Sequence, residues 1–283
     1  GLTCAYYLSH LGHEVHVYEA EAVPGGVFAW GIPEFRLPKE VLAKEIRAIE
    51  KAGVKIHLNN RIDNVKFEEL YKKSDAVYIA IGTQASPLLG IPNESVRGVE
   101  SGLNFLRRIG LKKDLSVPER MVIVGGGSTA FDVARTAVRL GSREVTILYR
   151  RTEAEMPAHR EEVAAAVEEG VKIMTLVAPV SILDKDGRVF GIKCVRCRLG
   201  EYDKDGRRRS EKIDGTEFVI ECDGVITAIN QVLDRDFAAV TDIKMNNNGG
   251  LDVNKFTVET SRKGVFAGGD ANPWGANIVI QAI

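Results

Sequence analysis

Three small residues at a fixed spacing offer the clearest chemistry in this sequence. Gly125, Gly127 and Ala130 form a G-x-G-x-x-A pattern between an apolar run at 121–124 and a stretch with helical spacing at 128–140. In such a strand–turn–helix unit, backbone N–H groups at the helix start can bind a pyrophosphate. The predicted dinucleotide contacts are Gly125, Gly126, Gly127, Ser128, Thr129, Ala130 and Asp132. The alternative is a glycine-rich turn that binds no ligand.

The residues after the next apolar run indicate which dinucleotide would bind. Tyr149 ends that run, and Arg150 and Arg151 follow where an NAD site places an acid for the ribose 2′-hydroxyl. Two guanidinium groups suit a 2′-phosphate, which they can hold through charge-assisted hydrogen bonds. The pattern favours NADP(H) over NAD(H) without fixing the choice. The alternative is a solvated arginine pair.

A second, partial copy of this unit begins the chain. A helix is expected at 1–11, a strand at 15–20, and Gly12 stands between them. When the two copies are laid together, Gly1 takes the place of the third small residue. Glu19 then falls 18 residues after Gly1, about the spacing of a ribose-binding acid. We expect Glu19 to bind a ribose, the alternative being a solvated glutamate at a strand end.

The elements that must position these residues alternate along the chain. An aromatic, apolar loop is expected at 28–37, and a helix is expected to start at Ala276. From 180 to 228 the pattern changes to alternating strands, with hairpin turns at 186–187 and 205–206, which predicts an antiparallel flap. The other expected helices are 38–52, 67–73, 100–109, 128–140 and 161–169, and the other expected strands are 55–58, 76–81, 121–124, 145–149, 171–176 and 265–267.

Two nucleotide-binding units, the second inserted into the first, are the simplest arrangement of this series. The chain would cross between them near 90–101 and again near 228–234. It begins inside one expected helix and ends inside another, so we expect it to be a piece of a longer protein.

Composition limits the classes of partner. The 283 residues are 45% hydrophobic and 27% charged, which is ordinary for a globular protein with two cores. A formal net charge of −1 argues against nucleic acid or a membrane surface as the main partner. No run is long enough for a transmembrane helix, and the four scattered cysteines fit a reducing cytoplasm.

The cysteines do not predict redox or metal chemistry of their own. Cys194 and Cys197 have C-x-x-C spacing, but in an alternating strand residues three apart face opposite sides. We therefore interpret them as structural thiols rather than a reducible disulfide, and the four cysteines do not form a zinc or iron–sulfur pattern. The basic run at 204–212 is a solvated hairpin loop or, second, a docking patch for an acidic redox partner. His159 is either a solvated helix-entry residue or a contact to the NADP phosphate.

Four longer motifs carry a resemblance to a known family. They are GIPEFRLPKE (31–40), GGGSTAFDVARTA (125–137), YRRTEAEMPAHREE (149–162) and GVFAGGD (264–270). With them the chain resembles flavoprotein reductases that carry two dinucleotide-binding domains, and more narrowly the glutamate synthase small (beta) subunit group. That group includes the large subunit of NADH-dependent ferredoxin:NADP oxidoreductase and a domain of dihydropyrimidine dehydrogenase. The resemblance extends over essentially the whole chain.

The resemblance implies an α/β fold with two Rossmann-like dinucleotide-binding domains of three-layer ββα type. An NAD(P)-binding domain at 116–230 is inserted into a discontinuous FAD-binding domain at 1–115 and 231–283. The cofactors are FAD and NADP(H). The implied FAD contacts, in addition to Gly1 and Glu19, are Gly25, Gly26, Val27, Arg36, Leu37, Ile62, Ala80, Gly82, Thr83, Gly269, Asp270, Gly275 and Ala276.

The resemblance also implies which part of FAD several of these residues would contact. Glu19 would hold the adenosine ribose, Ile62 would approach the adenine through its backbone, and the loop at 31–37 would lie near the isoalloxazine. Asp270 would bind the ribityl or pyrophosphate part. The helix starting near Gly275 and Ala276 would direct its positive end at the flavin N1/O2 edge.

The sequence departs from the family pattern in three places. The first FAD strand, the two leading glycines of its fingerprint and the iron–sulfur segment that precedes them in relatives are absent. Ala228-Ile229-Asn230-Gln231 stands where relatives read A-I-G-Q, and asparagine tolerates the left-handed backbone of such a turn. The C-terminal helix is also shortened.

The implied activity is that of an NAD(P)H-dependent flavoprotein oxidoreductase. A hydride would pass from NADPH to FAD, and electrons would leave singly to an iron–sulfur or glutamate synthase large-subunit-like partner. This route needs no side-chain nucleophile or acid, so we assign no catalytic residue and no metal. The alternatives are a non-catalytic NADP(H)-binding fragment without FAD, or a subunit like that of ferredoxin:NADP oxidoreductase.

Overall fold

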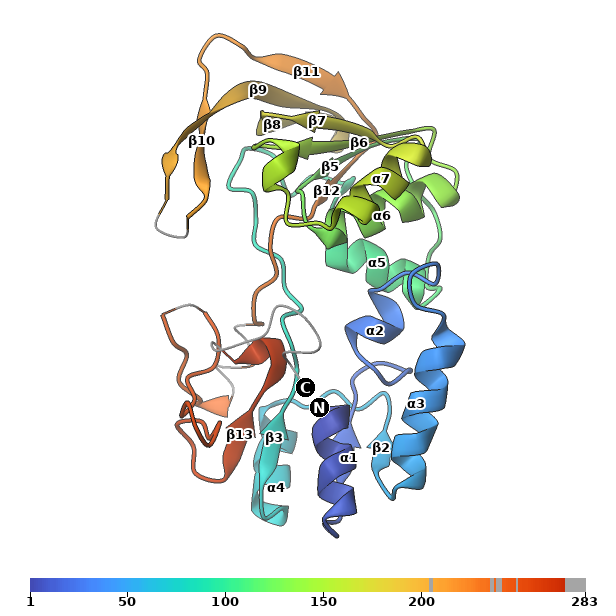
Figure 1. The fold of residues 1–283 in the computed structure, drawn as a ribbon, viewed down its shortest axis with the longest axis vertical. Helices are drawn as coiled ribbons and strands as arrows, with labels where there is room; N and C mark the ends of the chain where they lie inside the picture. The colour runs from blue at the N-terminus through green and yellow to red at the C-terminus, as the bar shows by residue number, and fades with distance from the viewer. Residues whose placement is uncertain (204–205, 235–236, 238–240, 248, 273–283) are drawn as a thin grey trace. The chain divides into compact units, whose positions relative to one another are not determined.

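The computed structural model describes residues 1–203, 206–234, 237, 241–247 and 249–272 (Figure 1). The chain divides into two compact units, each described below by itself. Unit 1 comprises Gly1–Ala29, Glu34–Ala85 and Gln231–Ile283, and unit 2 comprises Trp30–Pro33 and Ser86–Asn230. No helix in the described part of the chain is both long and apolar enough to cross a bilayer.

Unit 2 is built on a parallel sheet of five strands. Its order is β4-β12-β5-β6-β7, and every neighbouring pair runs parallel. The central strand β5 is almost wholly buried, as the unbroken apolar run at 121–124 predicts for a strand covered on both faces. The bounds are β4 Val99–Ser101, β5 Arg120–Val124, β6 Glu144–Tyr149, β7 Lys172–Thr175 and β12 Gly224–Thr227.

Unit 2 has three layers, because alternate side chains of the parallel sheet pack in opposite directions. Met121 and Ile123 pack with the helices α5 (Gly102–Gly110), α6 (Ser128–Arg139) and α7 (Arg160–Glu168). Val122 and Val124 pack against the antiparallel flap on the other face. The flap comprises β8 (Val177–Lys185), β9 (Arg188–Tyr202), β10 (Arg208–Lys212) and β11 (Phe218–Glu221) (Figure 1). The predicted ββα architecture is therefore confirmed.

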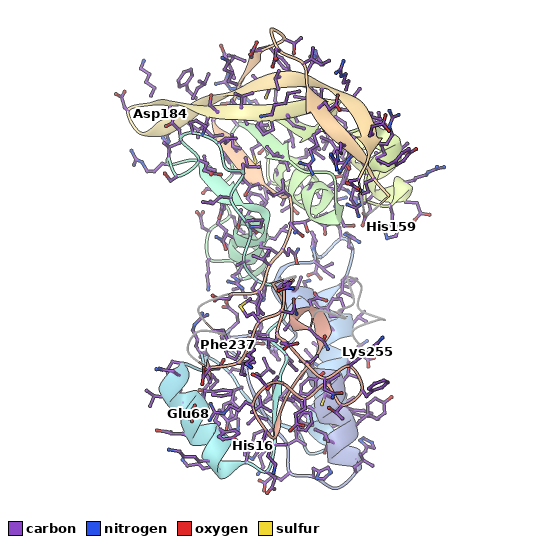
Figure 2. All side chains as sticks on the ribbon, turned by 90° about the vertical axis from the view of Figure 1, so that its left-hand side faces the viewer. His16, Glu68, His159, Asp184, Phe237 and Lys255 are labelled. Carbon is purple, nitrogen blue, oxygen red and sulfur yellow. The ribbon has the colours of Figure 1, made fainter. Side chains whose placement is uncertain are left out.

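The described residues of unit 1 contain two parallel pairs of strands. β1 (His16–Tyr18) pairs with β2 (Lys55–His57), and β3 (Val77–Ile79) pairs with β13 (Val265–Ala267). The helices are α1 (Leu2–His10), α2 (Val27–Trp30), α3 (Lys39–Lys51) and α4 (Asn64–Lys73). Asp63 caps α4 by accepting a hydrogen bond from the backbone N of Lys66. The carboxylate of Glu68 on α4 (Figure 2) receives two hydrogen bonds from the Arg262 guanidinium, which ties the C-terminal part of unit 1 to this helix.

Residues 86–115, which the 1–115 boundary places in the first domain, group with unit 2, as do Trp30–Pro33. The reason is that β4 pairs with β12 and α5 packs on α6, so residues 99–110 belong to the core of unit 2. The chain returns to unit 1 at Gln231. There Ala85 and Val232 exchange two backbone hydrogen bonds, so the incoming and outgoing segments are paired.

Two expectations were wrong in detail. The stretch 180–228 is not wholly antiparallel, because β12 enters the parallel sheet between β4 and β5. The loop at 28–37 begins with the short helix α2. The helix expected from Ala276, including the predicted contacts Gly275 and Ala276, lies outside the described residues.

Candidate functional site

The glycine turn after β5 is shaped by contacts on two sides. Gly125 has a φ of 151°, and a Cβ added there would overlap the carbonyl oxygen of Ala228. Its backbone N donates to the carbonyl of Leu148 at 3.0 Å, which fixes the turn to β6. A Cβ at Gly126 would lie 2.5 Å from the Tyr149 ring. Both positions therefore need glycine for the chain to pass between its neighbours.

Gly127 has a different role. Its backbone is extended (φ −93°, ψ 171°), and nothing in the described structure lies within 4 Å of where a Cβ would be. It occupies the N-cap of α6 and brings no side chain to cap the first-turn N–H groups. An open space in front of a helix N-terminus suits the negative charge of a pyrophosphate. The geometry therefore fits the dinucleotide predicted from the sequence.

The first residues of α6 are held by α7. The Ser128 hydroxyl donates to the Glu162 carboxylate at 2.8 Å, and the backbone N of His159 donates to the same oxygen at 3.1 Å. Glu162 is buried, whereas His159 is exposed at the start of α7 (Figure 2). The Ser128–Glu162 contact joins the N-termini of the two helices. Ala130 and Asp132 are buried in α6, and Thr129 is half-buried.

The segment after β6 returns to the glycine turn. The backbone N of Ala158 donates to the carbonyl of Gly126 at 3.2 Å, and the Tyr149 hydroxyl donates to the carbonyl of Glu155 at 2.7 Å. Thr152 and Glu155 form a capping box that orders the intervening turn. Residues 152–158 therefore form a fixed wall beside the predicted pyrophosphate position.

The two arginines expected at a 2′-phosphate have different environments. Arg150 is exposed at the end of β6. Arg151 is only 7% exposed, and its Nε donates to the carbonyl of Arg208 in the flap. Its guanidinium also lies 3.5 Å from the Asp203 carboxylate. Arg151 therefore holds the β9–β10 hairpin against the parallel sheet, and only Arg150 is open to solvent.

In unit 1, the expected flavin contacts around α1 lie at strand ends. Gly1 is the N-cap of α1, and a Cβ there would lie 2.8 Å from the Ala80 Cβ, so helix and strand end pack closely. Glu19 follows β1, and its carboxylate accepts a hydrogen bond from the backbone N of Glu21 at 3.0 Å. Its backbone N donates to the carbonyl of His57, which fixes it beside β2.

The ends of β3 and β13 bring a second group of expected residues together. Because the two strands are parallel neighbours, Gly82 and Thr83 emerge on the same edge as Gly269 and Asp270. Gly82 (φ 64°) and Gly269 (φ 68°) both have left-handed backbones that leave open space where a side chain would be. The surrounding protein partly desolvates the exposed Asp270 carboxyl and raises its pKa. This edge leaves the backbone of Gly82 and Gly269 open to a ligand.

The remaining residues that are expected to contact the flavin nucleotide lie on more exposed segments of unit 1. Gly26 has a left-handed backbone and open space beside it, but Gly25 faces Leu42 and Ile46 of α3. Gly25 is therefore in part a packing residue. Val27, Leu37 and Ile62 are half-buried and Arg36 is exposed.

Cys194 and Cys197 lie as the alternation along the strand predicts. Cys194 and Cys197 pack in different apolar clusters, which places them on opposite faces of β9. All four cysteines are free thiols, and burial raises the pKa of Cys194 to about 12. No cluster of three or more potential metal ligands occurs in the described ranges.

Comparison with known proteins gives the family. Residues 1–282 match the family described as pyridine nucleotide-disulphide oxidoreductase. The chain is 44% identical over 287 residues to the NADP(+)-dependent formate dehydrogenase subunit beta of Moorella thermoacetica, covering 100% of this chain and 40% of that protein. It is 34% identical over 300 residues to the glutamate synthase (NADPH) small chain of Escherichia coli (strain K12), covering 100% and 63%. The chain thus spans less than two thirds of the length of either relative.

A solved structure agrees with the fold. The chain superposes on FprA of Mycobacterium tuberculosis in complex with NADPH with a TM-score of 0.81 and 15% identity, covering 99% of this chain and 78% of that chain. The predicted fold class and the resemblance to the glutamate synthase small-subunit group are confirmed. The chain therefore belongs to the pyridine nucleotide-disulphide oxidoreductase family.

Proposed function

We propose that this chain transfers a hydride from NADPH to FAD, with unit 2 binding NADPH and unit 1 binding FAD. The observation that carries the proposal is the open N-terminus of α6, where Gly127 leaves space beneath the first-turn N–H groups. The bound flavin would accept the hydride at its ring and release electrons one at a time. The protein's share of the work is to hold and orient the two nucleotides.

Named residues divide this work. In unit 2 the turn at 125–127 would bind the pyrophosphate, Ser128 would be oriented by Glu162, and Arg150 would bind the 2′-phosphate. In unit 1 Glu19 would hold the ribose of FAD. The other proposed unit 1 contacts are Gly1, Gly26, Ala80, Gly82, Thr83, Gly269 and Asp270. We assign no proton-transferring side chain.

The onward acceptor is part of the same proposal. The two relatives are named as a subunit beta and a small chain, so each works with another subunit. We propose that the electrons pass to an iron–sulfur centre on such a partner, in the cytoplasm.

An anaerobic titration tests the hydride step. The purified chain is reconstituted with FAD, freed of unbound flavin and titrated with NADPH. The flavin absorbance at about 450 nm is recorded throughout. The proposal expects the absorbance to be lost in proportion to the NADPH added. A flavin that stays bound and oxidised beside bound NADPH would contradict it. A chain that binds NADPH but no flavin would support the alternative of a nucleotide-binding segment without activity of its own.

A further inference from the structure

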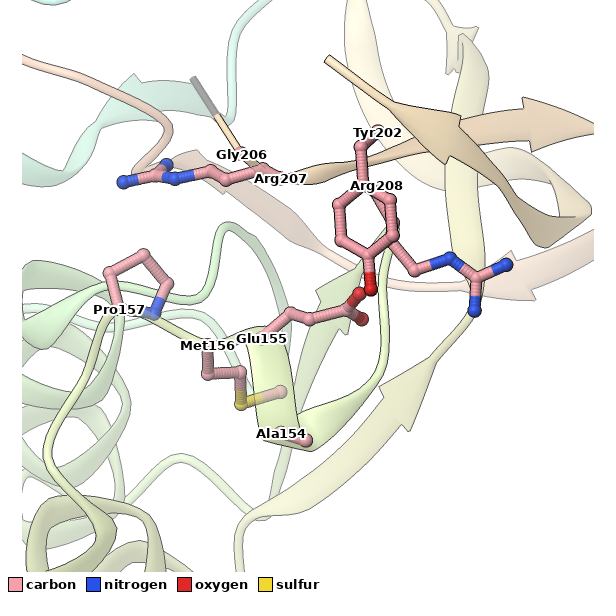
Figure 3. Close-up of a pocket in the computed structure, with 8 residues that line it drawn as sticks. All are labelled: Ala154, Glu155, Met156, Pro157, Tyr202, Gly206, Arg207 and Arg208. Atoms are coloured by element: carbon pink, nitrogen blue, oxygen red, sulfur yellow. The ribbon is translucent and has the colours of Figure 1, made fainter. Parts of the chain in front are cut away.

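A pocket lies in unit 2 between residues 154–157, which follow β6, and the flap. Its volume is about 340 Å³. One wall comes from the turn that follows Arg151, and the other comes from the β9–β10 hairpin, whose basic run 204–212 has no role in the function proposed above (Figure 3). The lining residues are Ala154, Glu155, Met156, Pro157, Tyr202, Gly206, Arg207 and Arg208.

The hairpin that forms this pocket is anchored. Arg151 holds it through the carbonyl of Arg208 and the carboxylate of Asp203, and the Ser210 hydroxyl donates to the carbonyl of Arg150 at 2.7 Å. Asp203 also accepts a hydrogen bond from the backbone N of Arg207 at 2.8 Å. The pocket therefore has a fixed position next to the end of β6.

The pocket also adjoins the glycine turn. Pro157 lies in its wall, and the next residue, Ala158, donates its backbone N–H to the carbonyl of Gly126. Arg150 directly follows the last residue of β6, Tyr149. In a βαβ unit of this kind, the end of the second strand is where the adenosine ribose of the dinucleotide lies. A phosphate on that ribose would thus lie on the side of the pocket.

The two arginines that line the pocket differ in the hydrogen bonds of their guanidinium groups. Arg208 uses its guanidinium on the carbonyls of Leu199 and Gly200. Arg207 is exposed, and Figure 3 shows its guanidinium above Pro157, on the opposite side from that of Arg208. Among the described residues its side chain makes no hydrogen bond or ion pair. Of the two arginines that line the pocket, Arg207 is therefore the one whose guanidinium is free to bind a ligand.

We propose that Arg207 determines the choice of nucleotide by binding the 2′-phosphate of NADP(H) together with Arg150. A phosphate dianion accepts charge-assisted hydrogen bonds from a guanidinium fork, and a ribose 2′-hydroxyl offers no such charge. The flap hairpin thus takes part in nucleotide selection, and Arg151 serves it by positioning the hairpin. This inference rests on the proposed binding of NADP(H) by unit 2.

A binding experiment with nucleotide fragments tests the role of Arg207. Calorimetry measures the affinity of the whole chain for adenosine 2′,5′-bisphosphate and for 5′-AMP, which lacks the 2′-phosphate. The variant is Arg207→Ala, with Arg207→Gln as a second. The matched control is Arg209→Ala, because Arg209 is an exposed arginine on the same hairpin that does not line the pocket. Both changes remove one positive charge, so a general field effect would be equal in the two.

The expected result is selective. Arg207→Ala and Arg207→Gln should weaken binding of the 2′,5′-bisphosphate about 10-fold or more and leave 5′-AMP unchanged. Arg209→Ala should leave both unchanged. Equal losses in the Arg207 and Arg209 variants, or no loss in either, would overturn the inference and leave the run as a solvated loop. If the unchanged chain binds adenosine 2′,5′-bisphosphate no more tightly than 5′-AMP, both the inference and the proposed use of NADP(H) fail. Neither measurement depends on flavin or on electron transfer.

Discussion

Gly127→Ala separates nucleotide binding from folding. The Gly127 backbone lies in a region that alanine adopts without strain, and a methyl group there would meet no atom of the described structure within 4 Å. The folded protein should lose nothing. It should gain about 0.4–1 kcal/mol, because alanine restricts the unfolded chain more than glycine does.

The same methyl group would occupy the space that we assign to the pyrophosphate. Losing two charge-assisted hydrogen bonds from the first turn of α6 costs about 3 kcal/mol or more, which corresponds to about 100-fold weaker binding of NADPH. The effect should be equal for NADH, since the pyrophosphate is common to both.

Gly125→Ala is the contrasting change. Its φ of 151° is unfavourable for alanine, and its Cβ would overlap the Ala228 carbonyl oxygen. Backbone strain and overpacking together should cost about 2–6 kcal/mol of folding stability. This variant should therefore lose stability and binding together.

Two measurements on each variant complete the test. Denaturant unfolding gives the free energy of unfolding, and calorimetry gives the dissociation constant for NADPH. The reasoning predicts that Gly127→Ala keeps its stability and loses its binding. If Gly127→Ala binds NADPH as tightly as the unchanged chain, the open space in front of α6 is not the pyrophosphate site.

Three other changes have defined outcomes. Arg150→Ala should weaken NADPH binding about 10-fold while sparing NADH, whereas Arg151→Ala should lower the melting temperature because the flap hairpin loses its anchor; both are measured by calorimetry and thermal unfolding. Two arginines of α6 hold the pKa of Glu169 at about 2, below its unfolded value of 4.5. The ion pairs of the charged Glu169 carboxylate with these two arginines therefore stabilise the fold above about pH 4.5. This stabilisation, on the order of 1–2 kcal/mol, is lost as the pH falls towards 2. In Glu169→Gln, the free energy of unfolding measured in urea should differ less between pH 5 and pH 3 than it does in the unchanged chain. Arg262→Ala should cost about 1–2 kcal/mol in denaturant unfolding, because it removes the bidentate pair with Glu68 and a cation over the Tyr71 ring.

The local part of the fold could be predicted from the sequence. The apolar run before Gly125 and the glycine that ends the following helix define the central βαβ unit, because strand, turn and helix signals lie within about 30 consecutive residues. The strand β4 was missed because only three residues form it, and its partner β12 lies more than 120 positions later in the chain. The strand β12 was placed in the flap because a short apolar run does not reveal whether its neighbours are parallel.

The site could be predicted only in part for the same reason. Arg150 and Arg151 are identical neighbours in the sequence, and only the contact of Arg151 with the carbonyl of Arg208 distinguishes them. Arg207 lies in a basic run whose composition indicates a solvated loop. Its place beside Pro157 depends on the pairing of β9 with β10. The hydrogen bond from Ser128 to Glu162 had one local signal, the position of Glu162 three residues after the helix N-cap.

The central claim is that a hydride passes directly from NADPH to the flavin. It is tested most directly by anaerobic stopped-flow reduction of the FAD-reconstituted chain with NADPH that carries deuterium at the transferred C4 position. The account predicts that flavin bleaching becomes slower with the deuterated cofactor and is unchanged when the other C4 hydrogen is replaced. Bleaching that is insensitive to deuterium at both positions, under conditions where the rate does not depend on the NADPH concentration, would contradict rate-limiting hydride transfer. Absence of bleaching with both nucleotides bound would refute the claim.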